Sequence, residues 1–177
     1  MSLPERLTAT LAAPRVGRLV AAGAGLAALL LVVAAVALTE WLQLNPCPLC
    51  IFQRVLDLAL AALLLGAAAL PARARAMRGL FAAALLVASA GVAVAGYQSW
   101  IQFSPPQLSC GPAAQGPIEQ LVAWLGERVP LLFLATGSCE STELSILGLS
   151  LANWSLVAYL ALASTIVLLL RAQRRAA

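Results

Sequence analysis

The sequence contains no histidine and no lysine, and only 10% of its 177 residues are charged. The absence of imidazole excludes His-ligated zinc, haem with a His ligand, and Ser-His or Cys-His catalysis. A soluble domain has about 25% charged residues, so this chain has too little polar surface to cover a water-soluble globule. Because 62% of the residues are apolar, the composition predicts a membrane protein.

Four long apolar segments predict membrane-spanning helices, since each can cross a hydrocarbon core of about 30 Å. They are residues 19–39, 51–70, 79–100 and 151–170. The second segment carries Arg54 and Asp57 in its first two turns. Backbone polar groups cannot face lipid unpaired. We therefore expect an all-α bundle of four transmembrane helices, forming a single integral membrane domain over residues 1–177.

The arginines indicate the orientation of this bundle. Of the 11 arginines, nine flank the first span, fill the loop between the second and third spans, or follow the fourth: Arg6, Arg15, Arg18, Arg73, Arg75, Arg78, Arg171, Arg174 and Arg175. The positive-inside rule makes this side cytoplasmic and places both termini there. A cleaved signal peptide is the alternative for the first segment, but its apolar run exceeds the usual length of about 7–15 residues.

The predicted outer face holds two loops, residues 40–50 and 101–150. The second loop is too long to be only a connector. Pro117 can open a helix within it, and apolar residues follow at helical spacing: Ile118, Leu121, Val122, Leu125 and Val129. We interpret residues 117–129 as a short amphipathic helix lying on the membrane surface. A helix packed on the top of the bundle is the alternative.

All four cysteines fall on the predicted outer side: Cys47, Cys50, Cys110 and Cys139. They allow three pairings. Structural disulfides stabilise mainly by closing long loops, so a bridge within the C-x-x-C of Cys47 and Cys50 would stabilise little. Redox chemistry explains this spacing better. Two structural disulfides and a four-cysteine zinc site are the alternatives, but zinc favours two close pairs, and we predict no metal site.

The position of the C-x-x-C supports redox chemistry. The second span should begin near Cys50, where unpaired N–H groups and the helix dipole stabilise a thiolate. Arg54 lies one turn deeper on the same face, and an ionisable residue inside a membrane is a functional candidate. The alternative for Arg54 is an ion pair with Asp57. Because no nucleotide-binding or haem motif is present, the expected electron acceptor is a lipid-soluble quinone, hydrogen-bonded by Arg54 beside Cys50.

These features together resemble the DsbB family, the membrane thiol:quinone oxidoreductases of disulfide formation. The resemblance covers nearly the whole chain and rests on these residues: Trp41, Cys47-Pro48-Leu49-Cys50 followed by Gln53-Arg54, Trp100-Ile101-Gln102, Cys110, Ala135-Thr136-Gly137-Ser138-Cys139 and Leu147-Gly148-Leu149. It implies a bacterial inner-membrane protein with a redox site that faces the periplasm.

The resemblance also implies a role for each cysteine. A Cys110–Cys139 disulfide would oxidise reduced DsbA, a soluble thioredoxin-like partner, with Cys110 forming the mixed disulfide. Cys139 would then pass to the first pair through a bridge with Cys47. This step would free Cys50 as the thiolate that faces ubiquinone, or menaquinone in its place, beside Arg54.

One position departs from the family pattern. Many members carry a histidine shortly before the Trp-x-Gln that ends the third span, whereas this chain has Gln98. Gln98 can donate a hydrogen bond to the quinone site but cannot titrate, so the resemblance carries over the electron route but not the proton route. The rival interpretation of the whole chain is a non-enzymatic four-helix scaffold with structural disulfides. A relative of vitamin K epoxide reductase is less consistent with the early position of Cys47.

Overall fold

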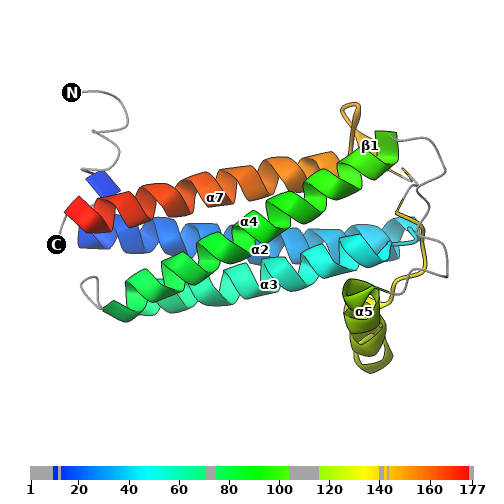
Figure 1. The fold of residues 1–177 in the computed structure, drawn as a ribbon, viewed down its shortest axis with the longest axis horizontal. Helices are drawn as coiled ribbons and strands as arrows, with labels where there is room; N and C mark the ends of the chain where they lie inside the picture. The colour runs from blue at the N-terminus through cyan, green and yellow to red at the C-terminus, as the bar shows by residue number, and fades with distance from the viewer. Residues whose placement is uncertain are drawn as a thin grey trace.

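The computed structural model describes residues 10–11, 13–70, 75–103, 116–139, 142 and 144–175. Within them, long helices run side by side along one axis (Figure 1): α2 (Pro14–Leu42), α3 (Pro48–Ala69), α4 (Arg75–Phe103) and α7 (Leu151–Arg175). These 4 helices are each long and apolar enough to cross a membrane. The predicted all-α, multi-pass architecture is confirmed.

Most helix ends extend beyond the predicted spans, because backbone hydrogen bonding continues past the apolar segment into the polar boundary; α3 instead ends one residue before the predicted residue 70. The helix α2 begins at Pro14 instead of residue 19 and ends at Leu42, and its C-cap residue Gln43 has a left-handed backbone with a φ of 52°. The helix α3 begins at Pro48, three residues earlier than predicted, because proline suits a first helical turn. The first outer loop is therefore shorter than residues 40–50.

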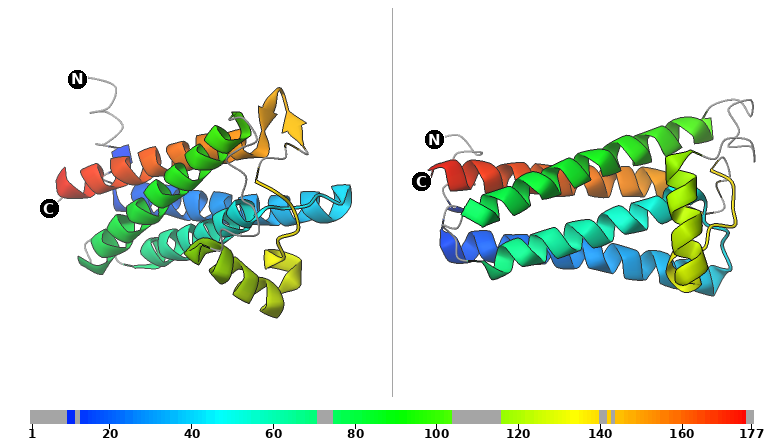
Figure 2. Two further views of the ribbon diagram at one scale, coloured as in Figure 1. Left: turned by 45° about the vertical axis from the view of Figure 1, so that its right-hand side comes forward. Right: turned by 60° about the horizontal axis from the view of Figure 1, so that its bottom comes forward.

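The helix α3 is the central element of the bundle. It packs against α2 and α4, and α4 packs against α7, whereas α2 and α7 touch only weakly (Figure 2). The core contains large side chains with no exposed surface, such as Leu60, Leu64 and Phe81. Fully buried alanines, including Ala84 and Ala88 on α4, let the helices approach closely. The pocket described below lies between α2 and α7, where these two helices touch only weakly.

The second outer loop contains more structure than the sequence predicted. Beyond α5 (Pro117–Arg128) it has the short helix α6 (Pro130–Phe133) and an antiparallel hairpin, β1 (Ser145–Ile146) with β2 (Leu149–Ser150). The helix α5 lies beside the start of α3, with its axis steeply inclined to that of the bundle (Figures 1 and 2). It stops at Arg128, and Val129 is its C-cap residue.

The amphipathic character of α5 is divided between two faces. Val122 is buried and packs with Ile51 of α3 and Phe133 of α6. Leu121 and Trp124 are exposed on the other side of the helix. One apolar face therefore packs on the bundle, while a second face remains available to lipid.

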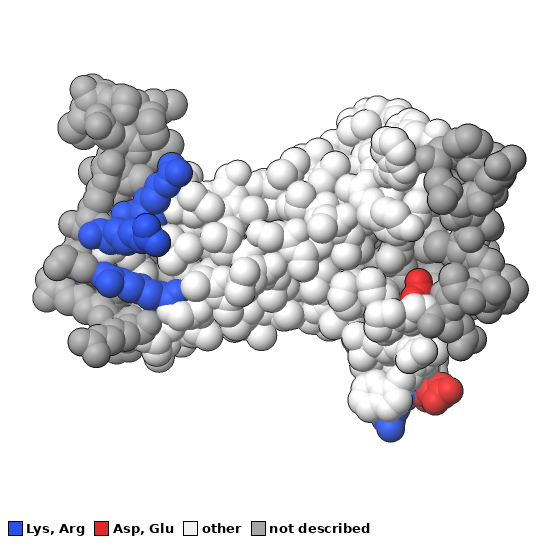
Figure 3. Space-filling model, in the orientation of Figure 1, with Lys and Arg blue, Asp and Glu red and all other residues white. Residues whose placement is uncertain are grey.

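Charge is segregated along the bundle axis (Figure 3). Most arginine side chains of the described residues gather at the end where α2 begins and α7 ends. The acidic side chains visible in this view lie at the opposite end, where α5 also carries Arg128. On the face that is shown, no charged side chain of the described residues lies between the two ends. This is the pattern expected for a bundle that crosses a bilayer.

Candidate functional site

The C-x-x-C lies at the start of α3. Cys47 has an extended backbone and caps the helix, accepting a hydrogen bond on its Sγ from the Cys50 N–H at 3.3 Å. The Cys47 thiol donates to the Cys50 sulfur at 3.0 Å, which is longer than the S–S bond of about 2.05 Å. The pair is therefore a dithiol in which Cys50 faces the positive end of the helix dipole.

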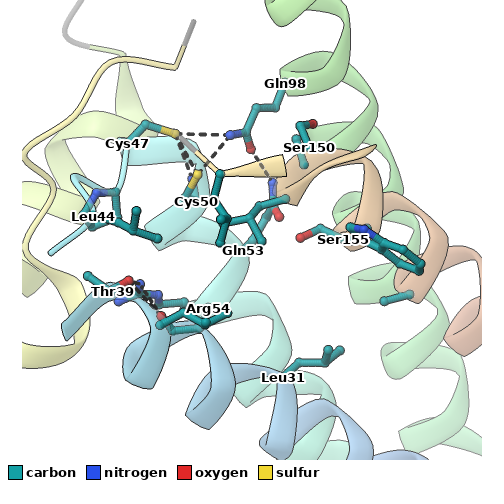
Figure 4. A pocket seen from close by; sticks show the side chains of 18 of the residues that line it. Leu31, Thr39, Leu44, Cys47, Cys50, Gln53, Arg54, Gln98, Ser150 and Ser155 are labelled. Carbon is teal, nitrogen blue, oxygen red and sulfur yellow. Dashed lines mark hydrogen bonds between the residues drawn. The ribbon is translucent and has the colours of Figure 1, made fainter. Parts of the chain in front are cut away.

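Gln98 of α4 reaches both sulfurs (Figure 4). Its Nε2 lies 2.9 Å from Cys50 Sγ and 3.4 Å from Cys47 Sγ, and its Oε1 accepts from Gln53 Nε2 at 2.7 Å. Gln98 is only 3% exposed. Because Gln53 fixes the orientation of this amide, Gln98 presents donors to the sulfurs and stabilises a negative charge at Cys50.

The second outer loop is docked on the first through its backbone. The N–H groups of Thr136 and Gly137 donate to the carbonyl of Pro46 at 3.0 and 3.1 Å. A Cβ at Gly137 would overlap the carbonyl oxygen of Asn45. Only glycine fits this close approach, which explains why the Ala-Thr-Gly-Ser-Cys segment has a glycine at position 137.

This docking places Cys139 beside Cys47. Cys139 is 1% exposed and Cys47 is 2% exposed, and both belong to one small apolar cluster. Hydrogen bonding with Cys139, then with Cys50, and burial raise the pKa of Cys47 above its usual range. Cys47 is therefore held as a protonated thiol between the two neighbouring cysteines. Cys110, predicted to act with Cys139, lies outside the described residues.

Arg54 is buried one turn below Cys50, with 5% of its surface exposed. Its guanidinium donates to Thr39 Oγ1 at 2.5 Å, to Ala35 O at 3.3 Å and to Leu132 O at 3.0 Å. The alternative ion pair with Asp57 is not present between these two described residues. Arg54 thus connects α2, α3 and the second outer loop, and a guanidinium has more N–H donors than these three bonds use.

A pocket of about 470 Å³ opens between α2 and α7, with α3 behind it (Figure 4). Its walls are mostly apolar side chains of α2 and α7, such as Leu31 and Val157. Its polar lining includes Cys50, Arg54 and Gln98. Small-molecule sites have this size and this pattern of an apolar cavity with few polar groups. The structure therefore brings Cys47, Cys50, Cys139, Arg54 and Gln98 together around one cavity; their roles stay predictions.

Sequence reasoning missed several residues of this site. Gln53 was noted only as part of a motif, and Thr39 not at all, because a hydrogen bond between separate helices leaves no local periodicity. Tyr159, which lines the pocket together with Asp57, is a lone tyrosine in an apolar span. A polar side chain within a membrane-spanning segment is the sequence feature that could have identified Tyr159 as a site residue.

Comparison with known proteins agrees with this arrangement. The profile of one protein family, Disulfide bond formation protein DsbB, matches residues 17–169. A protein named Disulfide bond formation protein B from Dechloromonas aromatica (strain RCB) is 43% identical over 153 residues, which are 86% of this chain and 91% of the relative. Another of that name from Verminephrobacter eiseniae (strain EF01-2) is 38% identical over 161 residues, covering 88% of this chain and 87% of the relative.

A third relative of the same name, from Aromatoleum aromaticum, is 37% identical over 133 residues, 75% of this chain and 78% of the relative. The matched region contains all four membrane helices almost completely and every cysteine. The family's name assigns it to disulfide bond formation, which requires a thiol or disulfide partner. A buried dithiol, a third cysteine docked against it and a matching profile lead to one conclusion: this chain is a membrane oxidoreductase of the DsbB family of disulfide bond formation proteins.

Proposed function

We propose that this protein re-oxidises a periplasmic DsbA-type dithiol protein and passes the electrons to a membrane quinone. The route runs from Cys110 and Cys139 to Cys47 and Cys50, and then to ubiquinone or menaquinone. The observation that carries the proposal is the position of Cys50, which lines an apolar pocket between two membrane helices. A soluble acceptor has no need of such a pocket, whereas a lipid-soluble one does.

The pocket residues fit a quinone. Apolar side chains of α2 and α7 suit its ring and tail, and the guanidinium of Arg54 and the amide of Gln98 can donate to its oxygens. Because α2 and α7 touch only weakly, a ligand can enter sideways from the bilayer. When bound, a quinone accepts two electrons and two protons.

The chain's own residues support the thiol exchange steps. Cys139 is held against Cys47 by the docked second loop, so a disulfide can pass between the loops without a large movement. Gln98 and the helix dipole stabilise the Cys50 thiolate that such an exchange leaves behind.

Energetics favour coupling to a strong acceptor. A DsbA-type protein has a potential of about −120 mV, whereas ordinary structural disulfides lie below about −300 mV and could not oxidise it. A Cys110–Cys139 disulfide must therefore be strained or be coupled to the quinone, and we infer that coupling is the larger effect. The segregated charge of the bundle supports placing the arginine-rich end in the cytoplasm and the cysteines at the periplasmic face of the inner membrane.

The test uses the purified full-length protein, a ubiquinone analogue and a reduced DsbA-type protein. We expect quinone reduction and partner oxidation at matching rates, abolished by Cys47→Ala and unchanged by Ser145→Ala in the exposed hairpin. Normal turnover by Cys47→Ala, or no quinone reduction by the wild type, would contradict the proposal. Extraction of bound quinone identifies its type.

The same preparation separates the enzyme from a non-enzymatic scaffold. A scaffold with structural disulfides keeps its cysteines oxidised and resists mild reductant. An enzyme has a C-x-x-C whose oxidation state follows the applied redox potential, measured by thiol alkylation across a titration.

A further inference from the structure

Asp57 is a partly buried acid whose Oδ1 is fully buried, and the electron route does not use it. It lies on α3 one turn below Arg54 and about 10 Å along the helix axis from Cys50, and all three side chains line the same pocket. Ionisable side chains inside a membrane are costly and are rare without a function. Its place in the pocket therefore needs an explanation.

The hydrogen bonds around Asp57 indicate a neutral carboxylic acid. Its Oδ1 is buried and has no hydrogen-bond partner among the described residues. The Arg54 guanidinium, which could neutralise a carboxylate, donates to α2 and to the second outer loop instead. An ionised Asp57 would thus place negative charge on a buried oxygen without a counter-ion, which is disfavoured.

Tyr159 of α7 is a buried neighbour of Asp57. Its hydroxyl donates its single proton to the backbone carbonyl of Gln53 at 2.9 Å. The Tyr159 oxygen also contacts the carboxyl of Asp57. Since a phenol has only one proton to donate and Tyr159 gives its proton to the Gln53 carbonyl, Tyr159 is a neutral neighbour that supplies no counter-charge to an ionised Asp57.

We propose that Asp57 is the internal acid that delivers a proton to the electron acceptor in this pocket, held in place by Tyr159. This inference rests on the proposed function. Gln98 of α4 cannot titrate. Asp57, which lies on α3 one turn below Arg54, provides the titratable group in its place.

The step balances with the groups present. The Cys47 thiol and the Cys50 thiolate form one disulfide bond, releasing two electrons and the Cys47 proton. The quinone takes up those two electrons and two protons to become a hydroquinone. Cys47 supplies one of the protons and the carboxyl of Asp57 the other. Asp57 is left ionised and regains its proton from water.

Few other charged or titratable groups face Asp57. The pocket lining contains Cys47 from the first outer loop, Cys50 and Arg54 from α3, and Tyr159 from α7. The described lining residues of α2 and α4 carry neither acids nor bases, although Glu40 acts on Arg54 from the end of α2. Asp57 is thus the one acid among the described lining residues.

The experiment compares Asp57→Asn with Glu127→Gln, an exposed acid on α5, and with Asp57→Glu. Infrared difference spectroscopy of the protein without added quinone should show a protonated carboxyl band that is lost only in Asp57→Asn. Single-turnover quinone reduction should fall by about 100-fold in Asp57→Asn, since a positioned acid contributes at least that much. Asp57→Glu should recover part of the rate, and Glu127→Gln should have none of these effects.

The controls separate the two proposals. Quinone affinity and thiol exchange with the reduced partner should stay unchanged in Asp57→Asn, which would show that the variant is folded. A wild-type protein that reduces quinone and an Asp57→Asn variant that does so equally fast would overturn this inference alone. A carboxyl band that survives in Asp57→Asn would overturn it too, and a wild type that reduces no quinone would overturn both proposals.

Discussion

The two halves of α3 differ sharply although one continuous helix forms both. Residues 48–57 carry four polar side chains that face the pocket, Cys50, Gln53, Arg54 and Asp57. Residues 58–69 contain only leucine, alanine and glycine, and Leu60, Leu64 and Ala67 are fully buried. In the first half, each polar side chain contacts a different kind of group on another part of the molecule, while the second half packs only against apolar surfaces.

This difference shows how the protein separates stability from chemistry. In the apolar half, shape alone holds α3 against its neighbours. In the polar half, every group depends on another element: Gln53 on α4, Arg54 on α2 and the second loop, and Asp57 on α7. Changes in the first half should therefore alter activity at nearly constant stability, and changes in the second half should do the reverse.

The largest expected effect is on stability, from Leu64→Ala in the apolar half. Leu64 has no exposed surface, and truncating a buried leucine costs about 2–5 kcal/mol. Unfolding in detergent should show this loss, while the KM for quinone stays constant in the folded protein. Leu86→Ala is the matched control, because Leu86 is 73% exposed on α4. A large change in quinone KM would contradict the division of roles.

Arg54→Ala should give the largest change in activity. It removes a buried charge that binds α2 and the second loop and faces the pocket, and hydrogen bonds to charged groups contribute about 1.5–3 kcal/mol. The KM for quinone should rise roughly 10- to 100-fold, while the KM for the dithiol partner stays nearly constant because Thr136 and Gly137 still dock the loop. Arg128→Ala on α5 should change neither value. Unchanged quinone dependence in Arg54→Ala would remove Arg54 from the site.

The apolar half of α3 was predictable and much of the polar half was not. Length and composition identify the spans, and the place of Cys50 near a helix start follows from local sequence. The partners of Arg54 do not, because Leu132 lies 78 residues away and Ala35 lies on another helix. The local alternative, an Arg54–Asp57 pair, is wrong for the same reason. The spacing of residues along one helix does not reveal that another helix offers hydrogen-bond acceptors to Arg54.

The substitution Gly91→Ala should break the contact that positions Asp57 without touching α3 itself. A Cβ at Gly91 would overlap the ring of Tyr159, and such overpacking costs about 1–3 kcal/mol. Displacing the ring would weaken its bond to the Gln53 carbonyl, so quinone reduction should slow together with a moderate loss of stability. Gly96→Ala on the same helix is the control, because nothing lies within 4 Å of its added Cβ. Equal results for the two variants would contradict this packing.

The smallest expected effect comes from Gln98→Leu, which tests whether α4 influences quinone reduction through the hydrogen bond from Gln98 to the Cys50 sulfur. The leucine keeps the volume but removes the donor to Cys50 and the acceptor for Gln53. Loss of the donor to the sulfur corresponds to about 1 kcal/mol, or roughly a fivefold slower reduction of quinone. Gln102→Leu, one turn further along α4, removes only a bond from Ser150 and should leave that rate unchanged. Stopped-flow measurement with the pre-reduced protein isolates the step. If both variants slow it equally, the Gln98 amide acts through general packing of α4 and not through the thiolate that it contacts.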